Sequence, residues 1–357
     1  MNAMILNYPE DKQATYPAIP ARFTQMILAL KRGGINATHY YVETTEDLVA
    51  HLRRERPSLV FSVALYTKDH NNIHAILESL DCPHIGSQSE ILELALSKAA
   101  LKDHWQKHGI LTPDYYVIKK TSKGKLSGLD ELIRIDDYPY IVKPSKEGNS
   151  RGLQEDSIVF NKAELDRLIA RLLEKYDEIL VEQYLGRYSD LREFTVAMIG
   201  NGDSALVMPV EIILQTRRRW RIVTTCDKDE HHTLAVPITD KELLLKVEET
   251  ARQALLVAGV QDYARCDMLL QGGKLYAIEI NGQPMLPDKW FAACAHVMKM
   301  DGDQYINAIF LSGIVRYLRQ KPAVMSIPKE MQSLIPEQIY HQLCEELQHE
   351  TGNNSSL

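Results

Sequence analysis

The chain has 357 residues, 45% of them hydrophobic and 25% charged, which is typical of a globular protein with two or three domains. Its net charge of −7 argues against a general nucleic-acid binder, and no apolar run approaches the ~20 residues that span a membrane. Five scattered cysteines without a C-x-x-C pair argue against disulfides or a zinc site and favour a reducing cytoplasm.

The first 95 residues alternate between short apolar runs and amphipathic segments. Strands are expected at 3–7, 38–42 and 59–64, and helices at 20–32, 44–56 and 71–80. This spacing predicts a small parallel sheet. No glycine-rich phosphate loop follows the first strand, so this part carries no nucleotide fingerprint of its own.

A helix is predicted over 90–108, where Lys98 alone would most simply be a solvated residue. Lys143 ends a predicted strand and precedes the small polar segment 145–152. A lysine beside free backbone N–H groups can hold phosphate oxygens. Taken alone, however, this pattern favours a plain strand and loop.

The run 179–185 predicts a strand with two interpretations. It is either a buried strand with Glu182 at its rim or a hinge strand whose exposed backbone edge pairs with an adenine. In the next strand, 193–199, Glu193 could accept hydrogen bonds from ribose hydroxyls. Thr239 and Glu242 then have the spacing of a capping box for a helix ending at Gly259.

Residues 266–281 read as a β-hairpin whose two strands are joined through a Gly-Gly turn. Arg265 and Asp267 share one face of the first strand, and Glu279 and Asn281 share one face of the second. Oxygen ligands of this kind suit Mg²⁺. The alternative is a surface hairpin with solvated acids. Beyond it, 288–320 is mostly helical, and the tail has one amphipathic helix near 336–349.

The order of these segments resembles the ATP-grasp superfamily, and within it the D-alanine–D-alanine ligases. The resemblance covers roughly residues 85–315 and rests on six matches, which are Lys98, Ile141-Val142-Lys143-Pro144-Ser145 with Glu147-Gly148-Asn149-Ser150, Val181-Glu182, Glu193-Phe194-Thr195-Val196, Arg265-Cys266-Asp267 and Glu279-Ile280-Asn281.

The resemblance implies a role for each matching position. Arg265 would be catalytic and would stabilise the transferring phosphoryl group, while two Mg²⁺ ions, or Mn²⁺ instead, would bind to Asp267, Glu279 and Asn281. The ATP-binding residues would be Lys98, Lys143, Glu147, Gly148, Asn149, Ser150, Glu182, Gln183, Tyr184, Leu185, Glu193 and Lys228. In this set Gln183 and Leu185 would bind adenine through their backbones.

Three segments depart from the D-alanine–D-alanine ligase pattern. The family's glycine-rich segment after the first strand is replaced by residues 6–11, its His-Gly segment by 61–66, and its Pro-Gly-Met segment by 282–289. We therefore expect the ATP half of the site to be kept and the substrate half to be changed. Candidates to read the new substrate are Asp288, Lys289 and the arginines Arg217, Arg218, Arg219 and Arg221.

The sequence thus predicts an α/β protein, α+β in its ATP-binding half, with the ATP-grasp fold. The predicted parts are an N-terminal domain (1–95), two ATP-grasp subdomains (96–186 and 187–321) and a tail (322–357). The resemblance implies an ADP-forming ligase that joins a small carboxylate to an amine, with neither a nucleic acid nor a membrane as partner. True D-alanine–D-alanine ligation, a non-catalytic ATP-binding protein and a homodimer stay open as alternatives.

Overall fold

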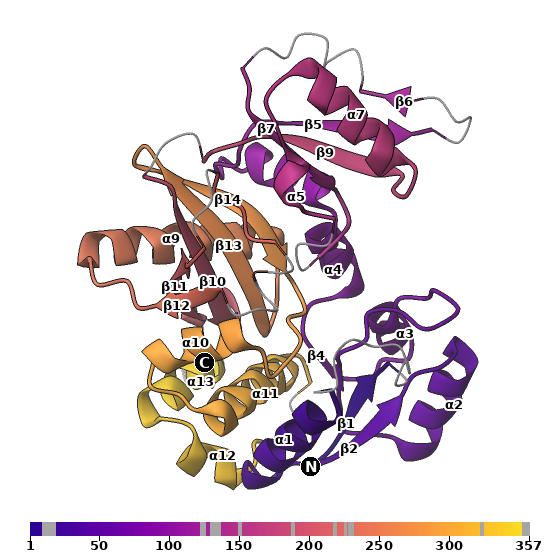
Figure 1. Cartoon of the computed structure of the whole chain (residues 1–357). Coiled ribbons are helices and arrows are strands. Elements are labelled where there is room, and N and C mark those ends of the chain that lie inside the picture. Colours follow the sequence, from indigo (N-terminus) through magenta and orange to yellow (C-terminus); the bar gives the residue numbers. More distant parts are fainter. Residues whose placement is uncertain are drawn as a thin grey trace.

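Three β-sheets with their own helices follow one another along the chain (Figure 1). The structure, a computed structural model, describes residues 1–8, 19–121, 126–128, 137–148, 152–186, 190–216, 220–224, 227, 232–321 and 325–351.

The N-terminal sheet is fully parallel, in the order β2-β1-β3-β4, as the sequence predicts. Successive residues of its central strand are buried on opposite faces, Ile5 toward α11 and Leu6 toward α2 and α3. Its elements are β1 (Asn2–Asn7), α1 (Ile19–Arg32), β2 (Asn36–Tyr41), α2 (Thr45–Glu55), β3 (Leu59–Ser62), α3 (Ile73–Ser79) and β4 (His84–Ile85).

Two helices, α4 (Ser89–Leu96) and α5 (Lys98–Lys107), connect this sheet to the next, so the single helix predicted over 90–108 is wrong. The break falls at Ser97, whose backbone is extended and whose hydroxyl accepts a hydrogen bond from the N–H of Ala100. Serine favours such a cap over a helix interior because its side chain competes for backbone N–H groups. Lys98 therefore begins α5 instead of lying in mid-helix.

The second sheet is antiparallel, in the order β6-β5-β9-β7-β8, and α7 packs against it (Figure 1). Its strand β9 lies between β5 and β7, with hydrogen-bonded neighbours on both sides. The elements are β5 (Tyr115–Lys120), β6 (Leu126–Ser127), β7 (Tyr140–Pro144), the 3₁₀ turn η1 (Glu155–Ser157), β8 (Ile158–Val159), α7 (Lys162–Leu173) and β9 (Glu178–Gln183).

The third sheet is also antiparallel, in the order β12-β11-β10-β13-β14. Phe194, Val196 and Met198 face a core shared with α9, whereas Ala197 faces the core around α10 and α11. The elements are β10 (Arg192–Ile199), η2 (Gly202–Ser204), β11 (Leu206–Leu214), β12 (Thr233–Val236), α9 (Lys241–Ala258), β13 (Tyr263–Gln271), β14 (Lys274–Asn281), α10 (Lys289–Val297) and α11 (Gly302–Gln320).

The cap predicted at Thr239 is displaced by one residue. Asp240 caps α9, because its carboxylate accepts hydrogen bonds from the N–H groups of Glu242 (3.0 Å) and Leu243 (3.1 Å). Gly259 ends the helix in the left-handed conformation, with φ +76°, as expected of a glycine after a helix.

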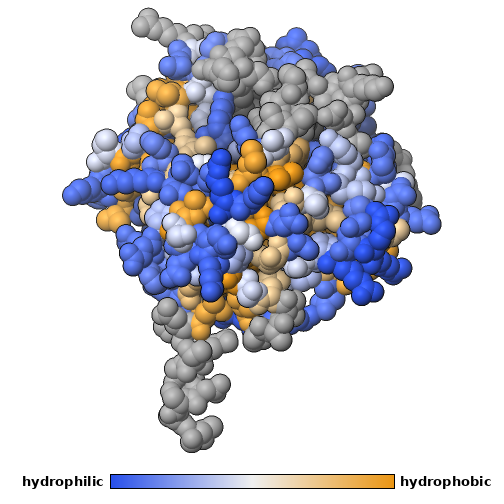
Figure 2. Space-filling view, turned by 90° about the horizontal axis from the view of Figure 1, so that it is seen from below, coloured by the Kyte–Doolittle hydropathy of each residue, from blue (hydrophilic) through white to orange (hydrophobic). Residues whose placement is uncertain are grey.

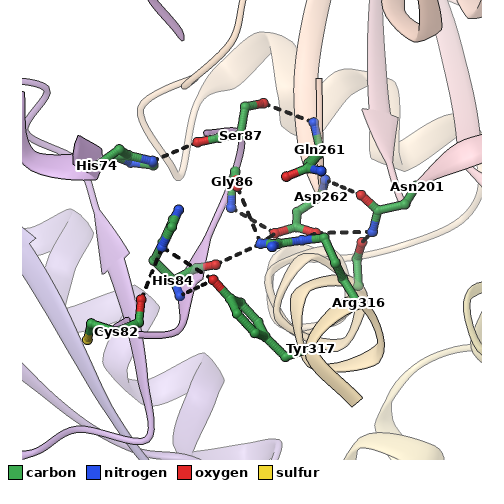
Figure 3. A network of polar contacts seen from close by, with 11 residues as sticks. His74, Cys82, His84, Gly86, Ser87, Asn201, Gln261, Asp262, Arg316 and Tyr317 are labelled. Carbon is green, nitrogen blue, oxygen red and sulfur yellow. Dashed lines mark hydrogen bonds and ion pairs between the residues drawn. The ribbon is translucent and has the colours of Figure 1, made fainter. Parts of the chain in front are cut away.

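The N-terminal sheet and the third sheet share one apolar core. The ring of Phe61 lies 5.6 Å from the rings of both Tyr263 and Phe310, measured between centroids. Beside this core, Arg316 of α11 donates hydrogen bonds to Asp262 (2.6 Å) and to the carbonyl oxygen of His84 (2.8 Å), as Figure 3 shows. Apolar packing and a buried ion pair thus join the two sheets.

The tail contains two helices, α12 (Lys329–Leu334) and α13 (Glu337–Thr351), where the sequence predicts one. Both pack on α11, so the tail docks on the preceding part of the chain. Seen from below, the surface is mostly hydrophilic, with apolar residues in small groups (Figure 2). Among the helices of the described residues, none is long and apolar enough to cross a membrane.

Candidate active site

A cavity lies between the second and third sheets, with walls from strands β7, β9, β10, β13 and β14. Ten of the residues predicted for the ATP and metal sites line it together. They are Lys98, Lys143, Glu147, Glu182, Gln183, Tyr184, Leu185, Glu193, Asp267 and Glu279. Residues nearly 200 positions apart in the chain, such as Lys98 and Glu279, thus meet in one space.

The other predicted residues fall into two groups. Gly148, Arg265 and Asn281 are described and are not among the residues that line the cavity. Asn149, Ser150 and Lys228 lie outside the described residues, as does the basic run Arg217-Arg218-Arg219.

The floor of the cavity is the predicted hairpin of β13 and β14. Its turn is Gly272-Gly273, both with positive φ (+54° and +74°), as two-residue hairpin turns require. In the register of the two strands, Asp267 lies opposite Glu279 and Arg265 lies opposite Asn281. The four predicted side chains therefore come from two adjacent cross-strand pairs on one face of the hairpin.

The donor set of this floor fits a divalent cation that prefers oxygen. Asp267 accepts a hydrogen bond from the hydroxyl of Thr195 (2.6 Å), which orients its carboxylate beside Glu279. Within the described ranges, no group of three or more His, Cys, Asp or Glu side chains could hold a metal ion. An ion here would depend on Asp267, Glu279, the amide of Asn281 and the oxygens of a phosphate substrate, as is usual for Mg²⁺.

Lys98 connects three elements around the cavity. Its ammonium lies 3.1 Å from Glu279 of β14 and donates to the carbonyl oxygen of Glu147, in the segment after β7. Its side chain is only 9% exposed, so the interpretation of Lys98 as a solvated helix residue is wrong. The start of α5 at Lys98 directs it into the cavity.

In the cavity wall, Glu182 forms ion pairs with two lysines. Its carboxylate lies 3.1 Å from the ammonium of Lys143 and 2.9 Å from that of Lys102. Burial alone would raise the pKa of Glu182, but the two lysines lower it below its ordinary value. Sequence reasoning missed Lys102, because a lysine one turn after Lys98 is typical of a solvated helix face.

Strand β9 supports the interpretation as a buried strand over that as a hinge strand with an exposed edge. Because β9 is paired on both sides, it has no exposed backbone edge along Glu178–Glu182. The N–H groups of Gln183 and Tyr184 donate to Asp114 (2.8 Å) and Pro139 (3.2 Å). Within the described part of the chain, Leu185 is the first residue after β9 whose N–H has no acceptor. Leu185 could therefore donate a backbone hydrogen bond to a base.

Arg221 lies in this same cavity and not beside the segment 282–289. Its guanidinium donates to Glu193 (3.1 Å) and to the carbonyl oxygen of Ile212 (2.6 Å). The hydroxyl of Tyr184 in turn donates to the carbonyl oxygen of Arg221 (2.8 Å). The structure thus brings Arg221 into the same cavity as Glu193 and Tyr184, and its role in binding a substrate stays a prediction.

The segment 282–289 runs along the side of the hairpin that faces the N-terminal sheet. Asp288 accepts a hydrogen bond from Arg265 (2.9 Å) and also caps α10 through the N–H of Phe291 (3.4 Å). The side-chain amide of Gln283 donates to the carbonyl oxygen of Ser62, at the end of β3. Burial opposes the charge of Arg265, yet Asp267 and Asp288 raise the pKa of the guanidinium above its ordinary value. Arg265 therefore stays charged.

Two D-alanine–D-alanine ligases are similar to this chain in sequence over more than half of its length. The D-alanine–D-alanine ligase of Carboxydothermus hydrogenoformans is 26% identical over 293 residues, which cover 80% of this chain and 90% of that protein. The D-alanine–D-alanine ligase of Cupriavidus taiwanensis is 28% identical over 214 residues, 59% of this chain and 62% of that protein.

Two solved structures have the same fold. The D-alanine–D-alanine ligase of Bacillus anthracis, complexed with ATP, superposes with a TM-score of 0.68 at 20% identity, over 90% of this chain and 99% of that one. The VanG D-Ala:D-Ser ligase of Enterococcus faecalis superposes with a TM-score of 0.67 at 16% identity, over 87% and 99%. The predicted ATP-grasp fold is confirmed.

A family model described as D-ala D-ala ligase C-terminus matches residues 104–309. This range includes β13, β14 and all strands of the second sheet, and therefore most of the cavity wall. Because the match covers more than half of the 357 residues, the chain belongs to the D-ala D-ala ligase C-terminus family.

Proposed function

We propose that this protein is an ATP-dependent carboxylate–amine ligase that forms an amide or peptide bond and releases ADP and phosphate. The observation that carries this proposal is the convergence of Lys98 and Lys143 with Asp267 and Glu279 around one cavity. Two ammonium groups facing two carboxylates are what a nucleotide triphosphate with its divalent ion requires.

The nucleotide would lie along the cavity from Tyr184 to the hairpin. Leu185 would pair with the base through its backbone N–H, and Glu193 would bind the ribose. Lys98 and Lys143 would contact the phosphates, with Glu147 and Gly148 at the mouth. Asn149, Ser150 and Lys228 are proposed for the same end of the nucleotide on the family resemblance alone.

The reaction would proceed in two steps. A carboxylate is a poor electrophile, so its oxygen first attacks the γ-phosphate, which yields an acyl phosphate and ADP. The amine then attacks the acyl carbon, and the bond to phosphate breaks. Both steps spread negative charge over oxygens, which Arg265 would stabilise from its position between Asp267 and Asp288. One or two Mg²⁺ ions held by Asp267, Glu279 and Asn281 would neutralise phosphate charge.

The carboxylate and amine substrates would bind where the hairpin meets the N-terminal sheet. In an α/β sheet of parallel strands, ligands bind outside the carboxyl ends of the strands. Asn7 and Ser62 end β1 and β3 at that edge, and Gln283 reaches it from the hairpin side. Among the described residues, the buried Nδ2 of Asn7 and Oε1 of Gln283 have no hydrogen-bond partner, which suits groups that await a polar substrate.

Substrates other than two D-alanines are favoured by the residues at this edge. The segment that differs from the family pattern contains Gln283, Asp288 and Lys289. In this segment Asp288 is paired with Arg265, and Gln283 donates to Ser62. One relative of the same fold is named as a D-Ala:D-Ser ligase, so the fold accommodates more than one substrate pair. True D-alanine–D-alanine ligation is the second candidate.

A substrate screen tests the proposal. Phosphate release from Mg-ATP would be measured with amino acids and related amines and carboxylates, singly and in pairs. The proposal expects release that requires both a carboxylate and an amine. Release with D-alanine alone would favour the second candidate. ATP binding without release in any combination would instead favour a non-catalytic ATP-binding protein.

A further inference from the structure

Lys102 is the most deeply buried lysine near the cavity and has no role in the function proposed above. We propose that Lys102 is a positioning residue that sets the charge of the nucleotide site through Glu182, without touching the nucleotide. This proposal rests on the assignment of the cavity to ATP. It concerns the second layer of residues, behind the lysines that meet the phosphates.

The contacts of Lys102 hold it away from the ligand. Its side chain is 0% exposed, and its ammonium lies 2.9 Å from Glu182, donates to the hydroxyl of Thr112 and faces the ring of Tyr115 at 5.7 Å. Lys102 is not among the residues that line the cavity, whereas Glu182 and Lys143 are. Its direct contact with the cavity wall is through Glu182.

Lys102, Glu182 and Lys143 form a buried charged cluster, and its net charge decides whether Lys143 can attract phosphate. The carboxylate of Glu182 lies 3.1 Å from Lys143, so these two groups by themselves carry no net charge. Lys102 is the second cation on the same carboxylate, and two ammonium groups with one carboxylate leave one positive charge. Because the cluster is buried, this charge is weakly screened and favours an anionic ligand.

The same arrangement also fixes where Lys143 points. With Lys102 on one oxygen of Glu182 and Lys143 on the other, the carboxylate is held from both sides. A purely structural role predicts that the loss of Lys102 lowers stability, since removing one partner of a buried ion pair is destabilising. A charge role predicts in addition a specific loss of nucleotide affinity in the folded variant.

The charge of Lys102 depends on pH within an accessible range. Burial lowers the pKa of Lys102 to about 8, although Glu182 opposes this shift. The charged groups around it are Glu182 on β9, Lys143 on β7 and, farther away, Glu279 on β14. As the pH rises through about 8, Lys102 loses its proton, the cluster loses its net charge, and MgATP should bind more weakly.

The test compares three variants with the wild-type chain by titration of MgATP, with the unfolding temperature of each as a check of folding. Lys102→Met removes the net charge of the cluster, and the double variant Lys102→Met/Glu182→Gln restores it, because Lys143 then stands alone. The control is Lys162→Met, which removes an exposed lysine of α7 that pairs with Asp166.

The proposal expects Lys102→Met to raise the Kd of MgATP about tenfold or more. The double variant should return to within about fivefold of the wild type, and Lys162→Met should not change the Kd. Weakening of the wild-type affinity above about pH 8 should disappear in both Lys102 variants.

An unchanged Kd in folded Lys102→Met would contradict the proposal, as would a double variant that binds no better than Lys102→Met. If Lys102→Met does not fold, the double variant decides, and a loss of more than about fivefold in its affinity would overturn the charge argument. Failure of the wild-type chain to bind MgATP would contradict the proposed function itself.

Discussion

Arg265 lies between two carboxylates that belong to different halves of the site. Its Nε is 3.4 Å from Asp267, a proposed ligand of the divalent ion, and its Nη1 is 2.9 Å from Asp288, in the segment that differs from the family. The first contact was expected from the hairpin pattern. The second depends on the path of the chain after β14, which no local pattern specifies.

Replacement of Asp288 should separate substrate recognition from nucleotide binding. In Asp288→Asn, Arg265 keeps only one carboxylate, and we expect the KM of the carboxylate or amine substrate to rise about tenfold, since hydrogen bonds between charged groups contribute about 1.5–3 kcal/mol. The Kd of MgATP should stay unchanged. Steady-state kinetics would measure the KM and a titration of MgATP the Kd, with the exposed Asp166→Asn as the control. A changed Kd with an unchanged KM would contradict this role.

Replacement of Glu279 tests the proposed ion site. Glu279→Gln keeps the volume of the side chain but removes a carboxylate that faces Asp267 and Lys98. We expect kcat to fall about 100-fold or more, because the charge of the phosphates is then poorly neutralised. Phosphate release with excess Mg²⁺ measures it, against the exposed control Glu249→Gln on α9. Activity close to that of the wild type would show that Glu279 is not a ligand of the ion.

The elements that hold the site were largely predictable, because their signals are local. The hairpin follows from two apolar runs around Gly272-Gly273, and the parallel N-terminal sheet follows from alternating strand and helix signals. The break at Ser97 was not predictable, because the apolar periodicity continues across it. The interior position of β9 stayed open between two interpretations, since strand order in an antiparallel sheet depends on contacts distant in sequence.

Two substitutions at the start of α9 test whether the observed cap, Asp240, or the predicted one, Thr239, stabilises the helix. Asp240→Ala should lower the free energy of unfolding by about 1 kcal/mol, because two N–H groups of the first turn lose their acceptor. Thr239→Ala, the matched change at the predicted position, should cost less than about 0.5 kcal/mol. Chemical denaturation of both variants would show the difference. A larger loss of stability in Thr239→Ala than in Asp240→Ala would show that Thr239 is the cap.

At the scale of the whole molecule, a buried polar network joins the N-terminal sheet to the third sheet (Figure 3). Asp262 accepts hydrogen bonds from Arg316 and from the N–H of Gly86 (2.8 Å). On the N-terminal side, His74 and His84 are buried with their rings 5.0 Å apart. Sequence reasoning did not connect these residues, because they come from three parts of the chain that are far apart, 74–86, Asp262 and Arg316.

The two histidines predict how stability depends on pH. Burial lowers the pKa of His74 from 6.5 to about 3, and it also lowers the pKa of His84. Below pH 6.5 the unfolded chain therefore binds protons that the folded chain does not, and stability falls as the pH falls. His74 alone should cost about 2 kcal/mol by about pH 5.

Urea denaturation between about pH 5 and 7 would measure this slope. His74→Gln should flatten the slope, whereas the exposed control His296→Gln should leave it as in the wild type. An identical slope in His74→Gln and the wild type would show that His74 does not supply the pH dependence.

The central claim is that ATP activates a carboxylate as an acyl phosphate, and isotope transfer tests it most directly. The carboxylate substrate identified by the screen would be labelled with ¹⁸O in both oxygens and turned over with Mg-ATP and the amine. The account predicts that one ¹⁸O atom of each carboxylate appears in the released phosphate, since the attacking oxygen leaves with phosphorus. Turnover that releases phosphate without ¹⁸O would contradict the acyl phosphate intermediate.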